Sequence, residues 1–316
     1  HYYAFYVQDD IKVSQKLTVN TGLRWDYESP LADRYNQLSF VDLNATVPLQ
    51  GVTPVDVGFG LGLRPQPQYE GAVGFPGRNG LGKGVTQPRY GDWGPRLGFA
   101  YSINDKTVIR SGAAVLYPGT TADNSGNYPT VQGFNPITNP VDTANGFTPF
   151  NNPGRAGLLS NPFPNGLNPV VGASLGPLTS VGNSNTGFLR NDKQPSVQQW
   201  NFGVQRELPQ NLLIEAAYVG SHGTHLEDFS GAQYNVLPDR YLSLGNALFD
   251  SLPNPFYGVA PVTSTVGASN TITREQLLLP YPYFTTVVGQ AGHIATSNYN
   301  ALQTKAQKRM SKGLSF

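Results

Sequence analysis

Residues 16–29, KLTVNTGLRWDYES, alternate between apolar and polar side chains along the whole stretch. One parity holds Leu17, Val19, Thr21, Leu23, Trp25 and Tyr27, and the other holds Thr18, Asn20, Gly22, Arg24, Asp26 and Glu28. Because successive side chains of a strand point to opposite faces, this pattern predicts a β-strand with one apolar and one polar face. Such a strand suits a soluble sandwich, and it also suits a wall between lipid and water.

The composition of the chain excludes several classes of protein. The 316 residues carry a net charge of +1, which gives no bias towards nucleic acid, and only 13% are charged, against about 25% in a typical soluble domain. The absence of Cys excludes disulfides and thiolate metal sites. The sequence contains no apolar run of about 18 residues, so it predicts no transmembrane helix. Residues 1–10 do not resemble a signal peptide, and we expect a piece of a larger protein.

The strand-like segments form pairs that are joined by short polar turns, such as Ser14, Gln15 and Lys16. We predict hairpins at residues 2–29, 96–117, 197–221 and 298–316. Long connections rich in Pro, Gly and Asn separate them, at residues 30–95, 118–195 and 222–296. Short turns at one end of the strands and long loops at the other are typical of outer-membrane barrels.

The pairing register of the first hairpin follows from its pattern. Folding the chain about Gln15 places Phe5 opposite Trp25 and Val7 opposite Leu23, with apolar partners on one face throughout. A slip of one residue would destroy this match. In the hairpin at 197–221, Trp200, Phe202 and Val204 share a face with Ile214, Ala216 and Tyr218, opposite to Gln199 and Asn201.

Aromatic residues gather on the apolar face near the long connections, as in the interfacial girdle of a membrane barrel. They are Tyr3, Phe5, Trp25, Tyr27, Trp200 and Tyr218. A strand of about 11 residues tilted by about 40° rises about 28 Å, which fits an apolar band of about 25 Å. The sequence therefore predicts an all-β fold, an antiparallel up-and-down transmembrane β-barrel segment of about seven or eight strands with long extracellular loops.

Two other classes of protein also fit this sequence. A secreted or surface-attached β-protein would bind glycans or peptides through loop aromatics, namely Tyr69, Tyr90, Tyr128, Phe134, Phe147 and Phe150. A passive porin is the other alternative. If Leu23, Trp25, Phe202 and Val204 were packed against a second layer of the chain, the membrane interpretation would be wrong.

Four phrases of the sequence resemble the barrel of Oar-like TonB-dependent transporters, which are outer-membrane receptors of Gram-negative bacteria. They are YAFYVQDDIKVSQKLTVNTGLRWDYESP, DWGPRLGFAYSINDKTVIRSG, VQQWNFGVQRELPQNLLIEAAYVGSHGTHL and SNYNALQTKAQKRMSKGLSF. The resemblance implies a 22-stranded barrel, a separate plug and N-terminal domain that we do not find in residues 1–316, and coupling to a TonB complex through regions outside this chain. It also implies that Asp9 and Asp10 belong to the barrel wall and are not catalytic.

The predicted role is therefore binding and transport, without an enzymatic activity or a cofactor. Lumen-facing polar residues are the candidate ligand contacts: Arg24, Asp26, Glu28, Gln199 and Asn201. The expected partners are outer-membrane lipid, the TonB complex and a ligand that is a small molecule, an oligosaccharide or a peptide.

Three other motifs have residue types that occur in functional sites. SHGTHLEDF brings His222, His225, Glu227 and Asp228 within seven positions, which is a weak zinc candidate in a polar strand exit, and we predict no metal site. GRNGLGKG, at residues 77–84, ends in Gly where a phosphate loop has Ser or Thr, and GFGLGLRP, at 58–65, has the composition of a turn.

Overall fold

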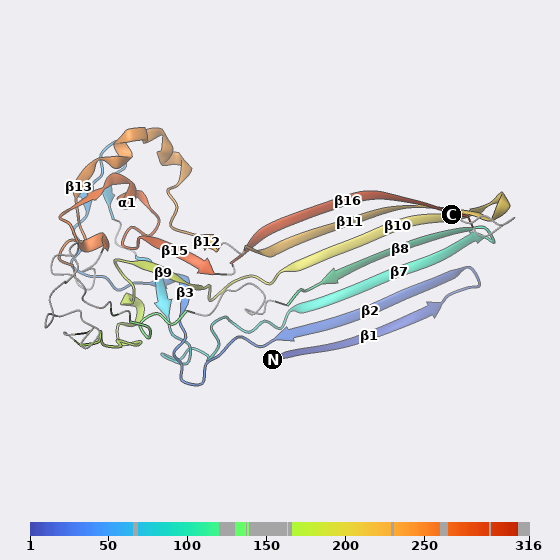
Figure 1. Cartoon of the computed structure of the whole chain (residues 1–316), viewed down its shortest axis with the longest axis horizontal. Helices are drawn as coiled ribbons and strands as arrows, with labels where there is room; N and C mark the ends of the chain where they lie inside the picture. Colours follow the sequence, from blue (N-terminus) through green and yellow to red (C-terminus); the bar gives the residue numbers. More distant parts are fainter. Residues whose placement is uncertain are drawn as a thin grey trace, which may run out of the picture.

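The computed structural model describes residues 1–65, 69–119, 130–136, 138, 163, 166–228, 231–259, 265–290 and 292–308. Seven of its strands form one antiparallel sheet, in the order β1-β2-β7-β8-β10-β11-β16. Their bounds are β1 (Tyr2–Lys12), β2 (Leu17–Glu28), β7 (Asp92–Asn104), β8 (Thr107–Leu116), β10 (Ser196–Leu208), β11 (Leu212–Asp228) and β16 (Gly292–Lys308). Figure 1 shows the short turns at one end of this sheet and the long connections at the other.

The register of the sheet confirms the predicted pairing. Phe5 lies opposite Trp25, Val7 opposite Leu23, and Phe202 opposite Tyr218. The apolar parity then continues into β7, because Trp25 also lies opposite Trp93 on that strand. The predicted strand at residues 314–316 and its turn at 311–313 lie outside the described residues.

The sheet is open. Among the described residues, β1 and β16 each pair with a neighbour along one edge only, as expected for a segment of a larger barrel. Three strands extend farther towards the long connections than predicted: β7 begins at Asp92, β11 continues to Asp228, and β16 begins at Gly292. A bulge between Gly223 and Leu226 lets β11 and β16 stay paired beyond the end of the predicted hairpin.

The three long connections fold together into a cap beyond one end of the sheet, at the left in Figure 1. Its paired strands are β3 (Phe40–Thr46) with β6 (Glu70–Gly74), β4 (Val55–Asp56) with β5 (Leu63–Arg64), β13 (Ser251–Pro253) with β14 (Thr271–Thr273), and β15 (Thr286–Gln290) with both β9 (Ser184–Phe188) and β12 (Ala232–Gln233). Its helical segments are η2 (Gly176–Leu178), η4 (Asp239–Phe249), η5 (Thr265–Gly267) and α1 (Arg274–Leu278), whereas η3 (Pro209–Asn211) forms the β10–β11 turn. Across the described part of the chain, no helix is long and apolar enough to cross a membrane.

The cap has a hydrophobic core of its own. Val41 comes from the first connection, Leu189 from the second, and Phe256 and Phe284 from the third, and all four are buried. Because each connection contributes side chains to one core, none of them folds as an independent loop.

The loop aromatics have different surroundings in the cap. Tyr69 is buried, Phe134 contacts Phe75 with ring centroids 6.0 Å apart, and Tyr90 is exposed. The remaining loop aromatics, Tyr128, Phe147 and Phe150, lie outside the described residues.

Candidate functional site

The apolar face of the sheet has no covering layer among the described residues. Phe5 is 67% exposed, Phe202 48% and Leu23 39%, while Trp25 and Val204 are half-buried by their neighbours within the sheet. Large apolar side chains in such numbers are rarely left facing water. The packing that would have contradicted the membrane interpretation is therefore not observed.

Four of the predicted interface aromatics form one cluster at the cap end of β1 and β2. Phe5 stacks on Trp25 with ring centroids 6.0 Å apart, and Tyr3 stacks on Tyr27 at 6.3 Å. Two further members of this girdle were not predicted from the sequence. Trp93 lies 6.2 Å from Trp25, and Tyr90 stacks on Tyr27 at 5.0 Å; the alternation in β7 would have assigned Trp93 to this face.

The other two predicted interface aromatics lie on β10 and β11. The Trp200 ring covers Gly220, where an added Cβ would come within 2.4 Å of the indole, so a larger residue at this position would displace the ring. The Tyr218 hydroxyl donates to Oδ1 of Asn300 on β16, at 2.6 Å. These aromatics share the apolar face with the first cluster, whose Trp93 lies on β7, and β8 separates the two groups.

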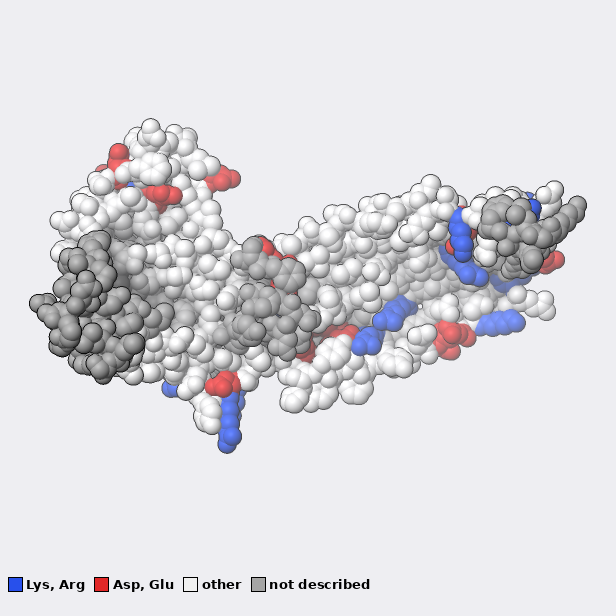
Figure 2. Space-filling model, viewed as in Figure 1, with Lys and Arg blue, Asp and Glu red and all other residues white. Residues whose placement is uncertain are grey.

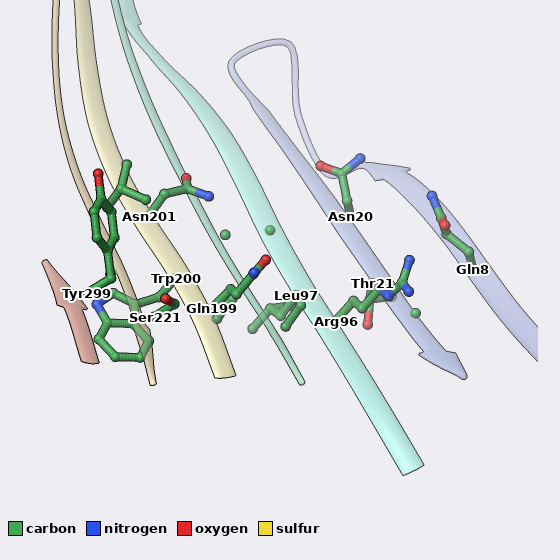
Figure 3. Close-up of a pocket in the computed structure, with 17 residues that line it drawn as sticks. Gln8, Asn20, Thr21, Arg96, Leu97, Gln199, Trp200, Asn201, Ser221 and Tyr299 are labelled. Carbon is green, nitrogen blue, oxygen red and sulfur yellow. The ribbon is translucent and has the colours of Figure 1, made fainter. Parts of the chain in front are cut away.

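The polar face contains a groove with a volume of about 570 Å³. Figure 3 shows that its labelled side chains come from neighbouring strands of the sheet. The polar side chains on this face are those of Gln8, Asn20, Arg96, Gln199, Asn201, Ser221 and Tyr299. Gly22, Gly98, Gly112 and Ala114 line its floor, so a ligand meets little steric obstruction there. The volume lies within the range of ligand pockets, roughly 300–1,000 Å³.

The predicted lumen residues divide into two groups. Gln199 and Asn201 line the groove, whereas Arg24, Asp26 and Glu28 do not. Arg24 lines a smaller adjoining hollow, which also includes Arg96. Five further polar residues of the groove were not predicted as ligand contacts, namely Gln8, Asn20, Arg96, Ser221 and Tyr299. Their parity in the strands would have placed most of them on this face.

Arg24 and Asp26 belong to a network at the rim of the sheet. Nε of Arg24 lies 2.9 Å from Oδ1 of Asp26, the Tyr2 hydroxyl donates to the same carboxylate, and Arg24 also donates to the Tyr2 oxygen at 3.0 Å. Asp26 is buried. Both charges therefore have partners within the chain, and their observed contacts are structural.

A second polar cluster connects the cap to the sheet. Arg89, from the first connection, donates to Oε1 of Gln194 at 2.6 Å and to the backbone oxygen of Asp192, both from the second. Nδ1 of the buried His293, at the start of β16, lies in hydrogen-bond contact with the Asp192 carboxylate. Burial lowers the pKa of Arg89, while Asp192, Asp92 and Glu28 act in the opposite direction. All three connections are thus joined at the neck of the molecule.

The weak metal candidates do not converge. Nδ1 of His222 lies 2.6 Å from Oδ1 of Asn298, and His225 has a positive φ at the β11 bulge. No group of three potential ligands suited to a metal ion exists in the part of the chain that the structure describes, which includes Glu227 and Asp228. Residues 77–84 and 58–62 lie in turns and loops of the cap, and Leu63 and Arg64 form β5.

Two solved structures are similar to the chain over a part of their length. They are the alcaligin outer membrane receptor FauA from Bordetella pertussis (9% identity, TM-score 0.33, covering 98% of this chain and 27% of that chain) and the siderophore receptor PirA from Pseudomonas aeruginosa (10% identity, TM-score 0.35, covering 99% and 32%). The chain thus spans about a third or less of these proteins. No functionally curated protein matches it.

A family comparison gives a match over the whole sequence. The family model described as an outer membrane beta barrel domain matches residues 1–316. That match agrees with the antiparallel sheet, its uncovered apolar face and its polar face. The chain therefore belongs to the outer membrane β-barrel domain family, whose place is the Gram-negative outer membrane.

Proposed function

We propose that this chain forms part of the wall and the outer loops of an Oar-like TonB-dependent receptor that captures and imports a ligand. The observation that carries the proposal is the open, two-faced sheet with a folded cap at one end only. Unpaired strand edges are not tolerated in lipid, so further strands would close the barrel. The apolar face would then contact lipid and the polar face would surround water.

In this receptor the cap lies outside the cell and forms the entrance. The groove that contains Gln199 and Asn201 lines the aqueous interior below it. A ligand of the small-molecule, oligosaccharide or peptide class passes from the cap to the groove. Regions outside residues 1–316 supply the plug and the contact with the TonB complex. Transport of this kind needs no catalytic residue, which agrees with a family of typically non-enzymatic barrels.

Electrical conductance distinguishes this receptor from a passive porin. We would reconstitute the whole protein in planar lipid bilayers and record the current under an applied voltage. A plugged receptor gives no steady conductance, whereas a porin gives stable open-channel steps. Open-channel steps in the untreated protein would contradict the receptor.

Adjacent residues on β10 test the two faces of the wall. The chain has no Cys, so single substitutions Asn201→Cys and Phe202→Cys have no background within residues 1–316. In the membrane-embedded protein, we expect a water-soluble maleimide to label Asn201→Cys and to leave Phe202→Cys unlabelled. A secreted β-protein would instead appear in the soluble fraction, and both positions would be labelled there.

A further inference from the structure

One charged side chain occupies the groove on the polar face. Arg96, on β7, is the only charged residue among the described residues that line it. Its guanidinium forms no ion pair with any described residue, whereas the neighbouring Arg24 is paired with Asp26. Arg96 also lines the adjoining hollow, so it stands where the two depressions meet. The groove therefore has an unneutralised positive centre.

Uncharged hydrogen-bonding groups surround this centre, as Figure 3 shows. The side chains of Gln8, Gln199 and Asn201 make no side-chain hydrogen bond with the described residues and remain available to a ligand. Asn20 donates to the carboxylate of Asp10, the acidic group closest in register to the groove, so the Asn20 amide is already engaged. Carboxamides donate and accept hydrogen bonds, as sugar hydroxyls require.

The floor of the groove lets a ligand approach the backbone. Gly22 lies directly opposite Arg96 in the β2–β7 register, and Gly98 lies directly opposite Gly112 in the β7–β8 register. An added Cβ at Gly112 would lie 3.4 Å from the Asn201 amide nitrogen, in ordinary van der Waals contact, so the Asn201 side chain lies beside this glycine on the floor of the groove. The result is a shallow surface with a single arginine and several amides.

We propose that this groove binds an acidic oligosaccharide and that Arg96 anchors its carboxylate or sulfate group. The guanidinium presents a fork of donors that matches an oxyanion in a bidentate way. The amides of Gln8, Gln199 and Asn201 hold the hydroxyl groups of the sugar rings. This inference rests on the proposed import function and specifies the class of ligand for the same site.

Calorimetric titration of the whole protein in detergent tests the inference with defined probes. The probes are tetragalacturonate, which carries carboxylates, a sulfated chitotetraose, and neutral maltotetraose. We expect at least one acidic probe to bind 10-fold or more tightly than maltotetraose. Comparison of the carboxylated with the sulfated probe identifies the oxyanion.

Substitutions at two arginines test whether the preference for acidic probes depends on Arg96. Arg96→Gln removes the positive charge and keeps an uncharged polar side chain, and we expect it to weaken binding of the acidic probe at least 10-fold while leaving any neutral binding unchanged. Arg96→Lys should recover part of the loss. Arg110→Gln is the matched control, because Arg110 is exposed on the same face but lies outside the groove; we expect less than a twofold change.

Three results would overturn the inference. They are equal binding of acidic and neutral probes, equal losses in the Arg96 and Arg110 variants, or no binding of either acidic probe. The conductance of the untreated protein is independent of these titrations. A blocked barrel that binds no acidic sugar would contradict the inference alone, whereas an open channel would contradict the proposed receptor.

Discussion

The sheet and the cap place the same kinds of side chain in opposite surroundings. In the cap, Phe284 and Phe256 are completely buried, each with 0% of its surface exposed. In the sheet, Phe5 and Phe202 remain 67% and 48% exposed. The cap buries its apolar surface against itself, and the sheet presents its apolar surface to the bilayer. The hydrophobic residues of one chain thus have two different environments, the protein core of the cap and the lipid around the sheet.

The sheet and the cap also differ in how their backbone polar groups are hydrogen-bonded. In the sheet, backbone groups are paired with adjacent strands over long ladders, which a membrane environment demands. In the cap, short strands leave many backbone groups to side chains. Asn235 donates to the backbone oxygens of Tyr281 and Phe284, and Asn185 donates to that of Gly71. The cap therefore depends on individual buried side chains, and the sheet does not.

The largest expected effect comes from removing an aromatic ring from the core of the cap. Phe284→Ala should lower the free energy of unfolding of the cap by about 3–5 kcal/mol, because it removes a fully buried ring and leaves a cavity. Hydrogen exchange of cap peptides in the whole protein measures the change. Phe249→Ala is the control, since Phe249 is exposed in the same cap, and it should change the stability by no more than about 0.5 kcal/mol. Equal effects at the two positions would show that the cap has no closed core.

A charge on the apolar face should have the next largest effect. Phe202→Arg should destabilise the protein in bilayers by about 2–4 kcal/mol, because the bilayer excludes a charged side chain. Its neighbour Asn201 points to the polar face, and Asn201→Arg should be nearly neutral there. Guanidinium unfolding in lipid vesicles measures both variants. A similar loss in both would mean that the two faces of β10 meet the same environment.

The sheet was predictable from the sequence because its pattern is local. Alternation in residues 16–29 determines which side chains share a face, and the position of the turn determines that Phe5 meets Trp25. The extension of β11 to Asp228 was not predictable in this way. It follows a bulge near His225, and there the alternation of side chains is interrupted.

The cap was not predictable from local pattern. Val41, Leu189 and Phe284 meet in one core although they come from three different connections. The candidate site was predictable in part. Gln199 and Asn201 follow from the alternation in β10, but the free guanidinium of Arg96 depends on which carboxylates lie near it, and only the assembled sheet decides that.

The pH dependence of the cap provides a smaller effect. Burial raises the pKa of Tyr283, whose hydroxyl donates to the backbone oxygen of Glu70. Above pH about 10 the tyrosine ionises in the unfolded chain and stays neutral in the folded cap. The unfolded state then binds fewer protons, so stability falls as pH rises, by about 1.4 kcal/mol per pH unit for this group.

The substitution Tyr283→Phe separates this contribution from the other tyrosines. At neutral pH we expect a loss of about 1 kcal/mol from the missing hydrogen bond. Above pH 10, the variant should lose stability less steeply than the natural protein, as measured by unfolding at successive pH values. Tyr257→Phe, at an exposed position of the cap, should keep the natural slope. If Tyr283→Phe lost stability with pH as steeply as the natural protein, the Tyr283 phenol would be exposed to water in the folded cap.

The smallest effect tests the junction at which the two regions meet. Nε1 of Trp25, on the apolar face of β2, donates to the backbone oxygen of Tyr90 at 2.9 Å, so an aromatic of the wall holds the end of the first connection. Trp25→Phe keeps an aromatic ring beside Phe5 and removes only the donor. We expect the free energy of unfolding to fall by about 1 kcal/mol and hydrogen exchange in residues 85–91 to become faster, with no change in the core of the cap.

Trp93→Phe is the control, because Trp93 belongs to the same cluster and its ring nitrogen makes no hydrogen bond with the described residues. If both variants loosened residues 85–91 equally, ring packing rather than the indole donor would join the cap to the wall.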